Sequence, residues 1–495
     1  MLAAIATPSV EWYALTPLLV LLGGSFACVL AAVLLPAGWK RPAGALIAVG
    51  CFAGAAVTAA VLFSDSSTPE SIVAGGAVRD QLGAFTGVIL SGIGLLAALV
   101  AWRHGLKRHG AEYFGLLLAA TAGMAFLVQA TNVMTLFLGL EWFSIALYIM
   151  CAYDVRREGS LEAGLKYLVV GGFGSAVLLF GSAFVYGATG ELGFSQIAAA
   201  TAQQDLSHDL FLLAGLAMII VGLGFKVSAA PFHMWTPDVY EGAPTPVTAF
   251  MAAATKAAAL VLTLRLLVTA FPDEAEVWTI ALAVIACVSL AVGNLAAIVQ
   301  TNVKRLLAYS SIAQAGFMLI AVASADETSG RALLFFLIPY GAASLGAFAV
   351  VAARERELGR PATLESMGGM GWERPLLGGA MWVFMLSFAG LPLTGGFVAK
   401  FYVFASAWDR GWEWLIIVGV VATAVSLYYY LGVIRAIYMR PGIALAAPAG
   451  GQPPRELALS AAVLASVVVV VGSFFAVEPL IDLAQDAAAS LSYPF

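Results

Sequence analysis

Long apolar stretches recur along nearly the whole chain and constrain its fold more than any other feature. A helix that crosses a bilayer needs about 20 apolar residues. Of the 495 residues, 61% are hydrophobic and only 11% are charged, which is too few charged residues to cover a core of this size in water. We predict an all-α polytopic membrane protein of about fourteen transmembrane helices. The predicted spans are 14–36, 42–63, 81–102, 113–130, 132–152, 167–187, 211–230, 246–271, 277–300, 306–324, 332–353, 376–404, 412–434 and 457–477.

Composition argues against several kinds of partner and cofactor. The net charge is -5, and no basic run offers a surface for nucleic acid. The chain has neither a dinucleotide fingerprint nor a phosphate-binding loop, so we expect it to hold no cofactor or metal of its own. Its N-terminus leads into the first span without a positive segment, which predicts a span rather than a cleaved signal peptide. Four cysteines lie in apolar stretches without a CxxC motif and are interpreted as small hydrophobic residues: Cys28, Cys51, Cys151 and Cys287.

Basic residues alternate between the connections that join the predicted spans. Most of the 24 Lys and Arg residues lie in odd-numbered connections, whereas even-numbered ones are acidic, as at Asp273, Glu274 and Glu276. The positive-inside rule then places odd connections in the cytoplasm and both termini on the outer side. The basic residues of the odd connections are Lys40, Arg41, Arg103, Lys107, Arg108, Arg156, Arg157, Lys166, Lys304, Arg305, Arg354, Arg356, Arg360, Arg374, Arg435, Arg440 and Arg455.

Four charged residues fall well inside spans, where charge is costly. Glu141 lies in the fifth span, Lys226 in the seventh, Lys256 in the eighth and Lys400 in the twelfth. Each costs about 2.5–3.5 kcal/mol at the bilayer centre, and a lysine stem does not cover the roughly 15 Å to either surface. A structural ion pair accounts for Glu141 and one lysine, but not for three lysines. Arg265, by contrast, lies near the outer end of its span, and we expect it to snorkel.

Lysines in such positions favour proton transfer over other ionic chemistry. Burial disfavours the charged form of a lysine, so that proton exchange occurs near neutral pH. The carboxylate of Glu141 has the opposite effect, so that pairing and unpairing switch a lysine between holding and releasing its proton. A sodium site would need clustered oxygen ligands instead. We predict that Glu141, Lys226, Lys256 and Lys400 form a proton relay.

Two of the lysines lie beside interruptions of their helices. Residues 227–235 follow Lys226 and contain Pro231, and residues 388–397 precede Lys400 and contain Pro392 and paired glycines. Broken backbone at membrane depth is tolerated only where protein packs around it or where it lines a wet cavity. We therefore expect the seventh and twelfth helices to be broken.

The two broken spans run in opposite directions across the membrane, which is typical of inverted repeats. The expected five-helix repeats are spans 4–8 and 9–13, each supplying one half-channel, with Lys256 joining them. The expected units are residues 1–111, 112–272, 273–440 and 441–495.

Two further residues are candidates for the relay. His233, just after the first break, either relays protons or caps a loop. Lys304 either extends the path or marks the cytoplasmic edge together with Arg305, and the edge is the favoured interpretation.

Several motifs resemble the antiporter-like subunits of respiratory complex I, and most closely the subunit N family. The resemblance covers nearly the whole chain and is clearest over residues 112–440. The matching segments are Gly139-Leu140-Glu141 with Ala146-Leu147-Tyr148, the run from Lys226 to Trp235, residues 236–244, residues 303–312, and residues 389–397 followed by Lys400.

This resemblance implies a proton-translocating membrane subunit of NADH-quinone oxidoreductase, a translocase subunit driven by quinone reduction elsewhere. It implies that Glu141 is the fifth-helix glutamate, Lys226 the lysine of the input half-channel, Lys256 the connecting lysine and Lys400 the lysine of the output half. NAD, FMN, iron–sulfur clusters and quinone would belong to partner subunits. The implied partners are the M-, K-, L-, A-, J- and H-type membrane subunits, in a bacterial inner membrane.

Related subunits and one departure qualify the resemblance. The M type usually has Glu at the position of Lys400, and the L type continues into a long lateral helix after its last span, whereas this sequence stops at Phe495. An Mrp-type cation/proton antiporter subunit without redox coupling is the alternative, although its loop after the seventh span usually differs. The family often has His where this chain has Gln314, so we expect water to carry any protons past the tenth span.

Overall fold

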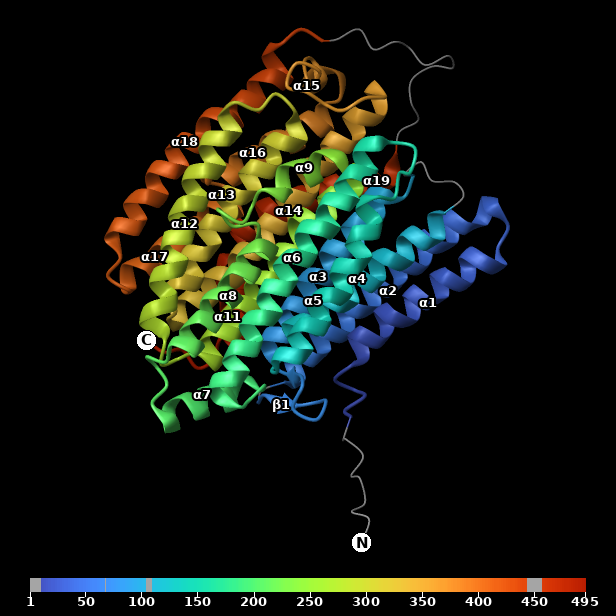
Figure 1. Ribbon diagram of the computed structural model, residues 1–495. Coiled ribbons are helices and arrows are strands. Elements are labelled where there is room, and N and C mark those ends of the chain that lie inside the picture. Colours follow the sequence, from blue (N-terminus) through green and yellow to red (C-terminus); the bar gives the residue numbers. More distant parts are fainter. Residues whose placement is uncertain (1–9, 67, 104–108, 443–455) are drawn as a thin grey trace.

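The computed structural model describes residues 10–66, 68–103, 109–442 and 456–495. Lys107, Arg108 and Arg455, used above to assign the sides of the membrane, lie outside the described residues. Within the described part, 13 helices are long and apolar enough to cross a membrane, and they stand side by side in one bundle (Figure 1). The predicted all-α membrane class is confirmed.

The first six spanning helices follow the predicted stretches closely. The main difference is that α6 begins at Glu158 rather than at residue 167, and it continues for 32 residues. Glycines let α6 pack tightly along α8, since a Cβ on Gly181 would lie 2.7 Å from the carbonyl oxygen of Gly215. The helices are α1 (Thr16–Leu34), α2 (Ala37–Asp65), α3 (Gln81–Ala101), α4 (Gly110–Val128), α5 (Val133–Cys151) and α6 (Glu158–Thr189).

Short elements that were not predicted gather at one end of the bundle. A hairpin of β1 (Glu70–Ser71) and β2 (Val78–Arg79) lies there with α7 (Phe194–Gln204), and α20 (Val477–Ala488) leads into the C-terminal residues. Residues of the hairpin, of α7 and of the C-terminal tail line one cavity of about 390 Å³. Val10 pairs with Val73 of the same hairpin, so both described chain ends lie at this end. Its assignment to the outer side of the membrane stays a prediction.

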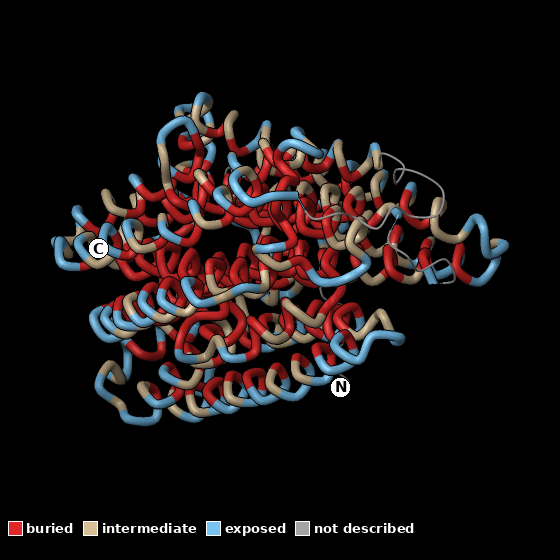
Figure 2. Tube along the Cα trace, turned by 90° about the horizontal axis from the view of Figure 1, so that it is seen from above, coloured by how far each residue is buried: buried red, intermediate tan, exposed pale blue. Residues whose placement is uncertain are grey.

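A single interrupted helix forms the centre of the bundle. It consists of α10 (Thr245–Phe250), the π-helical segment η1 (Met251–Thr255) and α11 (Lys256–Ala270). All of its residues except Thr269 are buried, and Figure 2 shows the buried residues gathered in the interior with exposed ones around the rim. Short π-helical segments within α-helices are often found at functional sites, and this one ends directly before Lys256.

The remaining helices complete the bundle, and two spans are broken as predicted. The seventh predicted span ends as α8 (Leu210–Val227) and is followed by the short α9 (Trp235–Gly242); the twelfth is divided into α16 (Pro375–Ala389) and α17 (Gly395–Asp409). The division of the chain at residues 111, 272 and 440 stays a prediction. The other helices are α12 (Ala275–Ile298), α13 (Val303–Ser324), α14 (Glu327–Leu358), α15 (Met370–Glu373), α18 (Glu413–Met439) and α19 (Leu457–Phe475).

Arg265 does not snorkel, so that expectation was wrong. Its guanidinium donates to both carboxylate oxygens of Asp80, at 2.6 and 2.9 Å, and the side chains are 4% and 1% exposed. Asp80 also caps α3 by accepting from the amide of Gly83. A bidentate pair keeps an arginine buried where a single cation would have to reach water. The pair therefore ties the end of α11 to the start of α3.

We expect Asp80→Asn to destabilise the protein by about 3–5 kcal/mol, because it leaves Arg265 buried without a countercharge. The asparagine oxygen still caps α3, so the loss reports on the ion pair. The measurement is the midpoint temperature of unfolding of the solubilised protein. As a control, Glu70→Gln removes one of the two carboxylates that pair with Arg79, one that is 45% exposed, and should cost about 1 kcal/mol or less. Equal shifts in both variants would contradict the account.

A second ionisable side chain, Glu274, is buried at this end of the bundle. Glu274 is 2% exposed and precedes α12, and both carboxylate oxygens are buried without a hydrogen bond from the described residues. Burial raises the pKa of Glu274 to about 7. A carboxyl whose pKa rises on folding favours the folded state less as the pH increases, because the unfolded chain releases the proton first.

Glu274→Gln should therefore raise the midpoint temperature more at about pH 8 than at about pH 5. The penalty from the carboxyl is absent below the ordinary value of 4.5, grows up to about 7 and is constant above it. Glu276→Gln, two residues further on at an exposed position, makes the same chemical change at the surface and serves as the control. A pH-independent effect of Glu274→Gln would count against the burial of a titrating carboxyl.

Candidate functional site

Lys226 lies in the last turn of α8 and is 3% exposed. Its amine donates to the hydroxyl of Ser144 on α5 at 2.9 Å. The rings of Phe143, Tyr148 and Phe225 surround it, with centroids 5.8–5.9 Å from the nitrogen. Aromatic faces attract a cation without fixing it by a formal charge. The pocket therefore accommodates an ammonium group but supplies no carboxylate in contact with it.

Glu141 lies one helical turn before Ser144 on α5 and is half-buried. Its carboxylate accepts a hydrogen bond from the hydroxyl of Ser175 on α6. Glu141 thus lies one turn from Ser144, the partner of Lys226, but Glu141 and Lys226 bind different serine hydroxyls. The structural ion pair considered above for Glu141 is replaced by these two serine contacts.

Lys256 opens α11 at the centre of the bundle and is fully buried. Its amine donates to the carbonyl oxygen of Val227 at 2.8 Å. Val227 is the last residue of α8, and carbonyls at a helix end lack an intrahelical partner. The first break therefore supplies the acceptor for the central lysine. It also brings the amine of Lys256 to the residue that directly follows Lys226.

Lys400 lies in the second turn of α17, just after the second break, and is 4% exposed. Its amine is 4.2 Å from the ring centroid of Phe317 and 3.4 Å from the hydroxyl of Thr423. Its stem packs on Gly390, where a Cβ would lie 2.8 Å from the lysine Cδ. Gly390 also has φ +74°, a left-handed conformation that glycine adopts without strain.

The two breaks are closed by the same hydrogen-bond pattern. In α8 the amides of Ser228 and Ala229 donate to the carbonyls of Phe225 and Gly224. In α16 the amides of Gly390 and Leu391 donate to those of Ser387 and Leu386. Both are Schellman caps, in which a left-handed residue ends the helix. The sequence predicted the breaks but not this equivalence of their caps.

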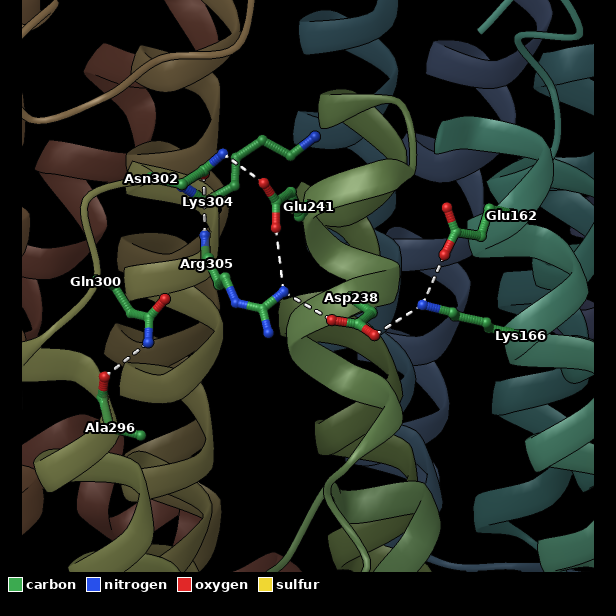
Figure 3. Close-up of polar contacts among 9 residues, drawn as sticks. All are labelled: Glu162, Lys166, Asp238, Glu241, Ala296, Gln300, Asn302, Lys304 and Arg305. Atoms are coloured by element: carbon green, nitrogen blue, oxygen red, sulfur yellow. Dashed lines mark hydrogen bonds and ion pairs between the residues drawn. The ribbon is translucent and has the colours of Figure 1, made fainter. Parts of the chain in front are cut away.

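Lys304 lies in the first turn of α13 and is buried. It is 1% exposed and donates to the carbonyl of Ala243, directly after α9, at 2.7 Å. Figure 3 shows that Lys304 and its neighbour Arg305 both extend toward α9. Both interpretations of Lys304, as a marker of the cytoplasmic edge and as an extension of the path, stay predictions.

A network of charges holds α9, which follows the first break (Figure 3). Asp238 accepts from Arg305 at 2.6 Å and from Lys166 at 2.8 Å. Glu241 accepts from Arg305 at 3.1 Å and from the amide of Asn302 at 2.9 Å. These contacts connect α6, α9 and α13, and they add to the packing of the buried residues of the short helix.

His233 lies in the loop between α8 and α9 and is half-buried. Its main-chain carbonyl accepts from the amide of Thr236 and closes the turn that begins α9. The imidazole Nδ1 is buried without a hydrogen-bond partner among the described residues. Both roles of the side chain, as a proton relay and as a loop cap, stay predictions.

The buried lysines and the buried arginines differ in their partners. The amines of Lys226, Lys256, Lys304 and Lys400 donate to hydroxyl or carbonyl oxygens, all of them neutral. Buried Arg265, by contrast, faces a carboxylate, and Arg354, which is 0% exposed, contacts two. A neutral oxygen accepts a hydrogen bond from an amine as well as from an ammonium group. The lysine sites thus tolerate loss of a proton, whereas the arginine sites are structural.

Several polar side chains of this site were not singled out from the sequence. Ser144, Ser175 and Thr423 contact the charged residues directly. Their signal was weak, because a serine or threonine in a membrane helix commonly bonds to its own backbone. Of the three, Ser144 alone could have been predicted from the sequence, because it lies one helical turn after Glu141. In the described residues, no group of three or more His, Cys, Asp or Glu side chains is placed to hold a metal ion, and all four cysteines are free.

Comparison with known proteins places this arrangement in one family. Residues 130–426 match the family described as NADH:quinone oxidoreductase/Mrp antiporter, TM. The chain is 38% identical over 499 residues to NADH-quinone oxidoreductase subunit N 2 of Roseiflexus castenholzii, with 97% of each chain covered. A chain of respiratory complex I from Thermus thermophilus with bound Aureothin superposes with a TM-score of 0.78, at 35% identity, covering 95% of this chain and 99% of that one. A chain of the Mrp complex from Dietzia sp. DQ12-45-1b shares the fold, with a TM-score of 0.82 at 21% identity, covering 96% and 97%.

Gly390→Ala should destabilise the protein by about 1–2 kcal/mol, the cost of a left-handed backbone for a residue with a Cβ, and should displace the stem of Lys400. Gly379→Ala in the same helix is the matched control, because a Cβ there meets nothing within 4 Å and alanine favours a helix. Midpoint temperatures of the two variants test this. A Gly390→Ala variant as stable as Gly379→Ala would show that the break does not require glycine.

Proposed function

This chain belongs to the subunit N family of NADH-quinone oxidoreductases, and we propose that it carries protons across a bacterial inner membrane through its buried lysines. The relative from Roseiflexus castenholzii is a subunit of such an enzyme, which supports a role as a proton-translocating membrane subunit. The mechanism proposed here concerns the route within this chain.

One observation carries the proposal: among the described residues, the hydrogen-bond acceptors of the buried lysine amines are neutral oxygens. A buried ammonium without a countercharge is costly, so each site favours release of the proton when a route for it exists. A proton arriving from a neighbouring site restores the charged form. Lys226, Lys256 and Lys400 can therefore hold the proton in turn.

The order of the sites follows from their positions. Glu141 and Lys226 form the first half-channel, where the carboxylate on the same helix face as Ser144 favours the ammonium form of Lys226. Lys256 is the connecting group, since its amine binds the end of the helix that carries Lys226. Lys400, beside the second break, begins the half-channel that opens to the opposite side. His233 and Lys304 extend the first half toward α9.

The energy for transport would come from quinone reduction in other subunits, so this chain acts as a translocase subunit without its own redox group. NAD, FMN, iron–sulfur clusters and quinone would be held by those partners. Glu141 is half-buried on a face that also exposes Leu138 and Ile145. A carboxylate at this depth is costly in lipid, which supports coverage of this face by another membrane subunit, of the M, K, L, A, J or H type.

An Mrp-type cation/proton antiporter subunit without redox coupling is the second candidate, supported by the shared fold. Purification in mild detergent distinguishes the two. Co-purification with flavin, iron–sulfur clusters and NADH oxidation supports the redox-driven complex. A redox-free hetero-oligomer would instead favour the antiporter.

Lys400→Ala and Glu141→Ala should lower the number of protons pumped per NADH oxidised by the assembled enzyme in proteoliposomes. The first removes the amine that lies beside the second break, and the second removes the carboxylate that favours protonated Lys226. Glu365→Ala, at an exposed position, is the control and should leave the ratio unchanged. An unchanged ratio in both relay variants, with assembly intact, would overturn the relay.

A further inference from the structure

Three polar side chains of α13 face the region between the central lysine and the second break. Ser310, Ser311 and Gln314 are each 2–3% exposed. Polar groups in such a place are normally paired, and each of these has a partner on another helix. The partners show that the three residues belong to two separate hydrogen-bonded clusters.

The first cluster lies at the second break. The Gln314 amide nitrogen donates to the carbonyl of Phe388 at 2.9 Å and to the hydroxyl oxygen of Tyr430 at 3.1 Å. The Phe388 carbonyl only accepts, so the NH₂ group of Gln314 must face it. The Tyr430 hydroxyl is also 2.6 Å from that of Ser310, and either oxygen can be the donor. Gln314 thereby holds the Tyr430 oxygen beside Ser310.

The second cluster lies beside the central helix. The hydroxyl of Tyr340 on α14 is 2.9 Å from that of Ser311 and donates to the carbonyl of Ala252 at 3.1 Å. Ala252 belongs to η1, the π-helical segment that ends directly before Lys256. This cluster thus reaches the backbone that presents the central amine.

The ring of Phe388 separates the two clusters. Its centroid is 5.7 Å from that of Tyr430 and 6.2 Å from that of Tyr340. The space bordered by Ser310, Ser311, Tyr340 and Phe388 has no room for a water molecule. In this conformation, therefore, no water joins the clusters. Phe388 immediately precedes Ala389, the last residue of α16, so its position depends on the break beside Lys400.

We propose that Tyr340 with Ser311, and Tyr430 with Ser310, are the hydroxyl groups that carry a proton between Lys256 and Lys400. Gln314 acts as the positioning residue for Tyr430, and the Phe388 ring must move for the two pairs to connect. The ammonium of Lys256 loses one proton and the amine of Lys400 gains one, while each hydroxyl oxygen accepts one proton and releases another. This link rests on the relay proposed above and replaces the expectation that only water serves the tenth span.

Tyr430→Phe in the assembled enzyme tests the link, because it removes one hydroxyl and keeps the ring. The expected result is a fall in protons pumped per NADH equal to that of Lys400→Ala. Tyr153→Phe is the control: it also removes one tyrosine hydroxyl, but that hydroxyl donates to the carbonyl of His109, outside both clusters. It should leave the ratio unchanged.

Gln314 variants test positioning apart from structure. Gln314→Leu should reproduce the loss seen in Tyr430→Phe, and Gln314→His should restore pumping, because an imidazole N–H can still donate to Tyr430. Loss in both variants with unchanged assembly would contradict the positioning role.

The outcomes separate this link from the relay itself. If Lys400→Ala lowers the ratio but Tyr430→Phe and Gln314→Leu do not, the hydroxyl link is overturned and the relay remains. If Lys400→Ala has no effect, the relay and the link both fail. Equal losses in Tyr430→Phe and Tyr153→Phe would also overturn the link, since they would report a general effect of removing a tyrosine hydroxyl.

Discussion

The structure depends on how it accommodates basic side chains that are buried away from water. A cation buried in a medium of low dielectric is stable only beside a countercharge, or when it can give up its proton. The chain uses a countercharge for its buried arginines and neutral acceptors for its buried lysines. Arg265 is bound by a carboxylate on both of its terminal nitrogens, and such a pair joins helices permanently. Lys256 meets only a backbone carbonyl, so its charge is not fixed by its surroundings.

Helix breaks provide the neutral acceptors that this arrangement needs. An intact helix uses its carbonyls internally, whereas its last turn leaves them free. Val227 offers such a carbonyl to Lys256, and Phe388 offers one to Gln314. The same Schellman cap ends both helices. Proline and glycine in these spans therefore do more than bend the chain, because they place polar backbone groups at membrane depth beside titratable side chains.

The sequence predicted the spans, the two breaks and the buried charges, because each is visible within a short window. Lys256 and Lys400 stand out against apolar neighbours, and Pro231 and Pro392 mark the interruptions. Arg265 was misjudged for the opposite reason: its partner Asp80 lies 185 residues away, and no local pattern announces a contact of that kind. The clusters around Tyr340 and Tyr430 were missed for the same reason, since tyrosines are common in membrane helices and only tertiary packing aligns their hydroxyls.

The π-helical segment before Lys256 has a geometric consequence for the central amine. An α-helix advances by about 100° of rotation per residue, and a π-helical segment accommodates one residue more per turn of hydrogen bonds. If Met251–Thr255 were wound as regular α-helix, every side chain that follows would be rotated around the axis by roughly that angle. Lys256 would then no longer face Val227. The direction in which the Lys256 side chain leaves the helix is thus determined by the winding of the five preceding residues, and not by the rotamer of the lysine.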